Sequence, residues 1–270
     1  MSAISIPPEV IAAPLSCAPR QACAAACGDP VFAAFVRRSI DDLSRRRVAL
    51  TQGWLSRAEE NELSARSLEV HKIVHRHGAR WFPAPDGFSL AFGRGFPEWV
   101  TGIDMHAADR WLDAHARLRQ TFPLVGLQLK GAAGRCAALG STLEGIVALC
   151  LAGNRLVDAD IAALMAQPAA RGLVWLDLAG NELTMASLET LMAHAPALRR
   201  LHFRGNRIAD PTYEWQDHDG AIVLTAGTGA GELAARLGPR PWLEPPPYCT
   251  LFQSPDLYYP IPDLDEPPRS

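Results

Sequence analysis

One phrase occurs three times in the middle of this chain, and its spacing restricts the fold more than any other feature. The copies are Ile146–Asn154, Leu173–Asn181 and Leu198–Asn206. Each has apolar residues at its first, fourth and sixth positions, asparagine at the ninth, and a further apolar residue two positions later. A pattern that recurs at intervals of 27 and 25 residues indicates units that cannot bury their own apolar face. We therefore expect the units to stack on one another and share a continuous core.

Two weaker copies precede these three. They are Leu124–Leu129 and Val100–Met105, the second with Ile103 at the fourth position. The first residues of the five copies fall at 100, 124, 146, 173 and 198, so the intervals are 24, 22, 27 and 25 residues. Apolar residues at helical spacing between the strands predict one helix in each of three stretches, which are 105–118, 158–165 and 184–192.

A strand and a helix in about 25 residues, with the asparagine-ended phrase, resemble the leucine-rich repeats of the ribonuclease-inhibitor-like class. The resemblance covers residues 96–210. It implies an α/β fold, a short leucine-rich-repeat solenoid of parallel strands with the helices outside. It also implies that each asparagine turns inward and satisfies loop backbone groups. The early copies carry Ala108 and Ala132 there, so those two units are expected to leave their strands differently.

A second resemblance concerns the start of the array. Arg94–Val100 is similar to the entry strand of bacterial leucine-rich-repeat proteins that often carry a repeat-companion module. The acidic, tryptophan-containing helix of that module is not present in this chain. The excess of arginine over lysine and the abundant alanine are also typical of a GC-rich bacterial genome.

The flanking regions are expected to cover the two ends of the array, as terminal units of a solenoid require. Asp29 and Pro30 are typical of a helix start, and a second helix is expected from Ser56 to about His77. An Asp-Gly turn at 219–220 predicts a hairpin, followed by a short helix at 231–237. The predicted division is a flexible N-terminal segment at 1–28, a helical N-terminal cap at 29–95, the array at 96–210, a hairpin and helix cap at 211–238, and a proline-rich tail at 239–270.

The tail contains ten prolines in 32 residues, which favours an extended polyproline-like conformation. Its last part, Asp256–Glu266, interleaves aromatic and acidic residues. This part either docks on a partner or packs back along the array. We favour packing back, because large apolar side chains are costly to leave in water.

Charge and cysteine usage exclude several classes of function. The net charge of −3 argues against a globally basic nucleic-acid binder. No apolar run approaches the length that spans a membrane, and the N-terminus lacks the basic start of a signal peptide, so we expect a cytoplasmic protein. Its six cysteines are then expected to be reduced thiols. Cys17, Cys23 and Cys27 are spaced C-x5-C-x3-C, a poor match to zinc sites.

The predicted register identifies the residues on the concave face, because side chains alternate along a strand. The central outward positions are Asp104, Gln128, Cys150, Asp177 and His202, flanked by Gly102, Gly126, Ala148, Trp175 and Arg200 on one side and by His106, Lys130, Ala152, Ala179 and Arg204 on the other. Tryptophan and arginine dominate binding hot spots. The predicted partner-binding residues are therefore Gln128, Lys130, Trp175, Asp177, Arg200, His202 and Arg204, with Trp175 exposed unless a cap or the tail covers it.

Cys150, Asp177 and His202 are the residue types of a cysteine-protease triad. A nucleophile must touch the histidine, with the acid behind the imidazole. Here the aspartate lies on the strand between the other two, so we expect no catalysis by these residues. We expect only a neighbouring Asp177–His202 pair that favours protonated histidine.

His71, His75 and His77 form the other candidate, a metal site on a helix. His71 and His75 share a helix face, as in zinc sites at this spacing, but no third ligand is fixed and the glutamate of HExxH is absent. We expect a solvated helix end and no metal.

The sequence thus favours a non-enzymatic module that binds another protein or a peptide and needs no cofactor. The alternative is an accessory or catalytic subunit of a modification system, metal-dependent through the His71 region. A third hypothesis makes the acidic aromatic tail the ligand for a partner's pocket. The sequence does not predict the oligomeric state.

Overall fold

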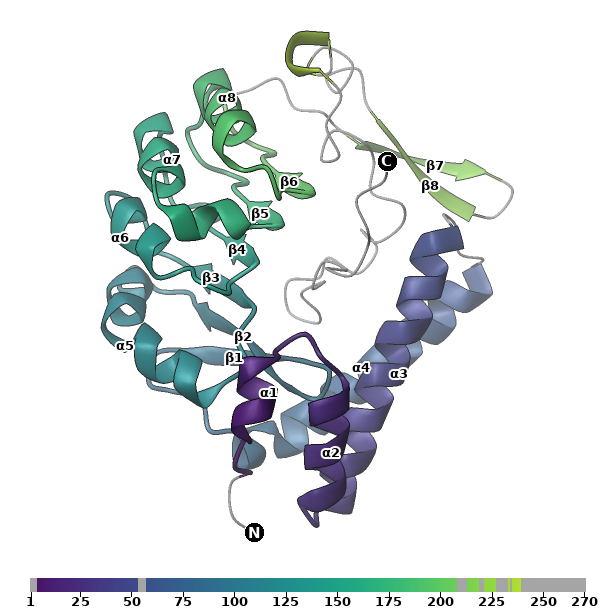
Figure 1. Ribbon diagram of the computed structural model, residues 1–270. Helices are drawn as coiled ribbons and strands as arrows, with labels where there is room; N and C mark the ends of the chain where they lie inside the picture. Colours follow the sequence, from purple (N-terminus) through teal and green to yellow (C-terminus); the bar gives the residue numbers. More distant parts are fainter. Residues whose placement is uncertain are drawn as a thin grey trace.

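The computed structural model describes residues 4–52, 57–207, 213–218, 221–226, 233 and 235–238. Its centre is a six-stranded sheet in the order β1 to β6, in which β1 and β2 are antiparallel and the remaining neighbours are parallel (Figure 1). The strands are β1 (Ser89–Gly93), β2 (Phe96–Gly102), β3 (Gly126–Leu129), β4 (Ala148–Cys150), β5 (Trp175–Asp177) and β6 (Arg200–His202). The fold is therefore α/β with a mostly parallel sheet.

Helices connect the parallel strands and lie together on one side of the sheet (Figure 1). They are α5 (Ala107–Thr121), α6 (Cys136–Ser141), α7 (Asp158–Met165), the 3-10 helix η1 (Pro168–Gly172) and α8 (Met185–His194). The three helices expected from periodicity are present as α5, α7 and α8. The short helices α6 and η1 were not among the expected elements.

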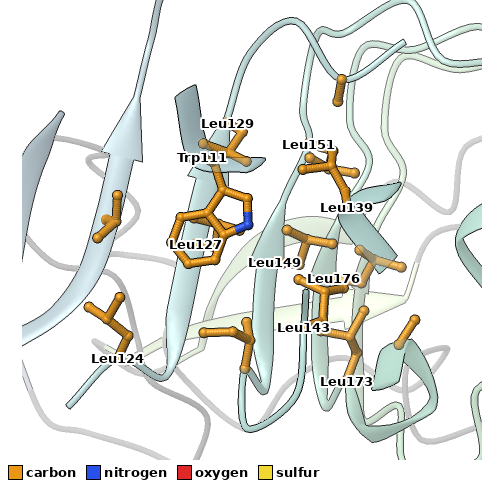
Figure 2. Packing of buried hydrophobic residues seen from close by; sticks show 14 of the residues in the cluster. Trp111, Leu124, Leu127, Leu129, Leu139, Leu143, Leu149, Leu151, Leu173 and Leu176 are labelled. Carbon is orange, nitrogen blue, oxygen red and sulfur yellow. The ribbon is translucent and has the colours of Figure 1, made fainter. Parts of the chain in front are cut away.

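The core lies between the sheet and these helices. Residues at equivalent positions of successive strands point into it, such as Leu127, Leu149, Leu176 and Leu201, which are paired in register. Figure 2 shows how the leucines of neighbouring strands lie beside one another, with Trp111 of α5 among them. Each unit thus covers the apolar face of the next.

A ladder of asparagine side chains joins the loops that follow the strands. Asn181 Oδ1 accepts hydrogen bonds from the backbone N–H groups of Asn154 (2.8 Å) and Leu156 (3.1 Å), and its Nδ2 donates to the carbonyls of Leu151 (3.1 Å) and Leu178 (2.8 Å). Asn154 binds the preceding unit in the same way, through Ala132 N–H at 3.0 Å. The expectation that these asparagines turn inward is confirmed.

The first unit departs from the predicted register. Val100 pairs with Leu127 and Thr101 with Gln128, so the strand is displaced by three residues from the expected Val100–Met105 copy. Ile103 and Met105, expected in the core, are 76% and 67% exposed. The reason is that β2 starts early, at Phe96, in a hairpin with β1 that the sequence analysis did not predict. Glycine at 95 is required there, since a Cβ would lie 2.7 Å from the backbone of Val36.

Four helices precede the sheet, α1 (Pro8–Ala12), α2 (Ala18–Ala26), α3 (Pro30–Gln52) and α4 (Arg57–Trp81). Asp29 accepts the N–H groups of Val31 (2.9 Å) and Phe32 (3.1 Å), so it caps α3 as expected. Its second oxygen accepts from Trp81 Nε1 at 3.0 Å, which fixes the start of α3 to the end of α4.

The expectation of a flexible segment at 1–28 is wrong for residues 4–28, which contain α1 and α2. Arg20 of α2 is fully buried and forms an ion pair with Glu98 of β2 at 2.9 Å. Arg94 binds the same carboxylate through two hydrogen bonds, at 2.9 and 2.8 Å. A buried carboxylate between two guanidinium groups therefore ties the N-terminal helices to the β1–β2 hairpin.

Beyond β6, β7 (Tyr213–His218) and β8 (Ala221–Ala226) form an antiparallel pair, as the predicted hairpin requires. Leu233 and Leu237 are buried in the main core. The proline-rich tail at 239–270 lies outside the described residues.

The asparagine ladder generates a stability prediction. Asn181→Ala leaves two buried N–H groups without acceptors, so the free energy of unfolding should fall by about 2–5 kcal/mol. Urea unfolding followed by circular dichroism measures this. The control is Asn206→Ala, because half-buried Asn206 accepts from Leu183 N–H at 3.1 Å and closes the ladder. Asn206→Ala should lower the free energy of unfolding clearly less than Asn181→Ala does. Equal losses in the two variants would contradict a stacked ladder.

The buried carboxylate generates a second prediction. Glu98→Gln leaves Arg20 and Arg94 as buried, uncompensated charges and should lower the free energy of unfolding by about 3–5 kcal/mol. Asp109→Asn removes a half-exposed partner of Arg135 and should change the free energy of unfolding by less than about 1 kcal/mol. Thermal and urea unfolding of both variants test the contrast, and similar losses would contradict it.

Candidate functional site

The sheet face opposite α5–α8, called here the front face, carries a second cluster of buried residues separate from the core. It consists of Trp99, Ala148, Cys150 and Trp175, with Ala91 and Ala152 packed against them. The paired rows Trp99, Gly126, Ala148, Trp175 and Arg200, and Thr101, Gln128, Cys150, Asp177 and His202, form this face. The predicted register is confirmed for β3–β6. In β2, Trp99 and Thr101 replace the expected Gly102 and Asp104.

Two tryptophans meet across this face. The ring centroids of Trp99 and Trp175 are 5.6 Å apart with the rings at 79°, although two strands separate β2 from β5. They can meet because the intervening residues are small: a Cβ at Gly126 would lie 2.2 Å from the Trp99 ring. Trp175 also contacts His202 edge-on, at 5.6 Å and 72°. We call Trp99, Trp175 and His202 the aromatic row.

The expectation that Trp175 is exposed is wrong. Trp99 is 1% exposed and Trp175 6% exposed, and Cys150 beneath them is also buried. Trp99 was not among the predicted residues, because the predicted register placed β2 three residues too late. The apolar and aromatic run Phe96–Val100 was the signal that could have placed it.

Cys150 is a buried thiol bound to its neighbour on the next strand. Its thiol donates to Asp177 Oδ2 at 3.5 Å, and the aspartate lies on the strand between Cys150 and His202. Burial, followed by the nearby Asp177 carboxylate, raises the pKa of the Cys150 thiol to about 12. The expected strand order of the three residues is thus confirmed, and the Cys150 thiol is protonated near neutral pH.

His202 has the opposite protonation from the one expected. Burial lowers the pKa of His202, the Asp177 carboxylate acts to raise it, and the Arg200 charge lowers it again. Desolvation outweighs the attraction that the sequence analysis considered alone. His202 is therefore a neutral ring within the aromatic row and adds no positive charge.

The remaining predicted binding residues differ in their availability. Lys130 donates to the carbonyl oxygens of Ala152 and Gly153, so its ammonium group supports a loop. Gln128 is partly exposed, and its Oε1 is buried with no hydrogen-bond partner in the described parts of the chain. Arg200 is partly exposed and Arg204 exposed, at the β6 end of the face.

The histidines at 71, 75 and 77 do not form a cluster. The helix α4 continues past them to Trp81, and His77 stacks on the Trp81 ring at 5.3 Å. Among the described residues, no group of three or more His, Cys, Asp or Glu side chains is placed to hold a metal ion. Within the same residues, no helix is long and apolar enough to cross a membrane.

Comparison with protein-family models and with curated proteins finds no match to this chain.

The pKa of His202 gives a measurable consequence. The unfolded chain takes up a proton near pH 6.5, whereas the folded protein does so only at lower pH. The contribution of His202 to stability is therefore complete above about pH 6.5 and is lost as the pH falls through the folded pKa.

Nuclear magnetic resonance titration should give a pKa below 6.5 for His202, and His202→Gln should reduce the loss of stability between pH 7 and 5. A pKa at or above 6.5 would restore the original expectation of a protonated ring.

Proposed function

We propose that this chain is a non-enzymatic leucine-rich-repeat protein that binds another protein or a peptide through its front face. The strand–helix units at 22–27-residue intervals, the leucine rows and the asparagine ladder support the leucine-rich-repeat assignment. A stack of such units offers an extended surface, and binding polypeptides is the common use of that surface.

The aromatic row is the observation that carries the proposal. Two indoles and an imidazole lie on strands β2, β5 and β6 of one sheet, so the sheet holds their positions. Rigid aromatic side chains supply large contact area at a small cost in conformational entropy. Gly126 and Ala148, which lie between the two tryptophans, carry no reactive group. Their chemistry favours a contact surface over a reaction centre.

Polar groups beside the row suit a polypeptide ligand. The Gln128 Oε1 acceptor can meet a backbone N–H of a bound chain, and satisfying a buried acceptor favours binding. Arg200 and Arg204 place positive charge at the β6 end. The buried thiol of Cys150 argues against nucleophilic catalysis at the same place. No observation on the described residues favours the metal-dependent alternative.

The test is affinity capture from the native host with the immobilised full chain, followed by mass spectrometry. Arg200→Ala combined with Arg204→Ala should reduce recovery of a specific partner at least about tenfold, as expected when hot-spot arginines are lost. Arg171→Ala, an exposed arginine on η1, is the matched control and should not change recovery.

Trp175→Phe serves as the second variant, because it keeps an aromatic ring in this buried position and so protects the fold. It should weaken capture as well. A partner retained equally by all variants binds elsewhere and would contradict the front-face proposal.

A further inference from the structure

We infer that the aromatic row takes an extended, proline-rich and acidic polypeptide, and that residues 239–270 of this same chain are its resting occupant. The inference rests on the proposed function, since it names the ligand class of the same face. It adds that binding of an external partner must displace a segment of the chain itself.

The burial of the tryptophans is the first argument. The Trp175 ring contacts Trp99 and His202, and Trp175 shares a buried cluster with Ala148 and Cys150; all of these residues belong to the front face. One layer of side chains on a sheet leaves its outer surface to solvent, yet Trp175 is only 6% exposed. Helices α5–α8 lie on the opposite face and cannot supply the covering layer (Figure 1).

Chemical fit is the second argument. Segments rich in proline adopt the polyproline helix with little loss of entropy and dock on surfaces lined by aromatic rings. Ten of the 32 residues at 239–270 are proline, and five are aromatic: Trp242, Tyr248, Phe252, Tyr258 and Tyr259. Such a segment has no core of its own and gains most by packing on an apolar face.

Charge gives the segment a direction. Residues 256–266 hold four acidic groups, Asp256, Asp263, Asp265 and Glu266, and no basic residue. Arg200 and Arg204 stand at one end of the face only, on β6 and just after it. Opposite charges fix the register of an extended ligand more than they add affinity. The acidic stretch is therefore assigned to the β6 end.

The chain is long enough for this placement. Leu233 and Leu237 are buried in the core, and Arg236 lies 3.5 Å from Glu189 of α8, so residue 238 is held beside the last unit. Thirty-two residues at about 3.1 Å each extend about 100 Å. Four strand spacings of about 4.8 Å separate β6 from β2, a distance of about 19 Å.

The first test uses the intact chain. A photoreactive benzoylphenylalanine replaces Tyr258 in one variant and Phe252 in another, and the crosslinked peptides are identified by mass spectrometry. Crosslinks to peptides 172–199 or 201–204, which carry β5 and β6, are the expected result. Crosslinks confined to the helix side of the sheet, or to β7 and β8, would overturn the inference. A mixture of isotopically light and heavy chains must give crosslinks within one chain, because crosslinks between chains would identify a second copy as the occupant.

The second test measures affinity. A specific protease site is placed between Gly238 and Pro239, the folded full chain is cut, and the released segment is removed by dilution and gel filtration. A fluorescent synthetic peptide of residues 239–270 should rebind the cut protein, as measured by anisotropy. The peptide should bind the cut Arg200→Ala protein at least tenfold more weakly than the cut unsubstituted protein. A peptide with Asn or Gln in place of the four acidic residues should likewise bind the cut unsubstituted protein at least tenfold more weakly.

Control measurements keep the two proposals separate. The uncut chain should not bind the peptide, and Arg171→Ala should bind it normally after cutting. Absence of rebinding by a cut protein that retains its circular dichroism would overturn the inference. If host capture still depended on Arg200 and Arg204, the front face would remain the binding site and only its resting occupant would be wrong.

Discussion

The structure depends on the way one asparagine side chain serves the backbone of two neighbouring units. Short strands of three or four residues leave many loop N–H and C=O groups in the interior, and each buried group must find a partner. Asn181 meets four of these groups, three in the preceding unit (Leu151, Asn154 and Leu156) and one in its own unit (Leu178). The leucines supply the free energy of burial, but the asparagines fix the distance and register at which the leucine rows meet.

That register has a consequence on the other side of the sheet. Equivalent residues of neighbouring strands lie beside one another, so Gly126 of β3 and Ala148 of β4 lie between Trp99 of β2 and Trp175 of β5. Both intervening residues are small and leave room for the indole rings. The rings of Trp99 and Trp175 contact each other above these small residues, and the Trp175 ring also contacts His202. Desolvation there keeps the Cys150 thiol protonated and the His202 ring neutral. The same burial therefore fixes the protonation state of both side chains on the front face.

Sequence reasoning succeeded where the pattern repeats and failed where it ends. The alternation of Leu149, Cys150 and Leu151 sufficed to place β4, and the same pattern placed β5 and β6. In the first unit, Val100, Ile103 and Met105 satisfied the apolar spacing by coincidence, while the antiparallel β1 actually determined where β2 lies. Pairing with an antiparallel strand that lies outside the repeat leaves no periodic signal. The burial of Trp175 was missed for a related reason, since the register gives the direction of a side chain but not what covers it.

The central claim is that the front face, through the aromatic row, is the surface that binds polypeptide. Fluorine resonance of 5-fluorotryptophan, assigned to position 175 by a Trp175→Phe variant, observes this surface directly in the intact chain. On titration with a captured partner, the Trp175 resonance should shift or broaden in proportion to the bound fraction, whereas that of Trp111, which lies in the core between the sheet and the helices, should stay unchanged. Saturation of the partner with no change at Trp175 would contradict the account.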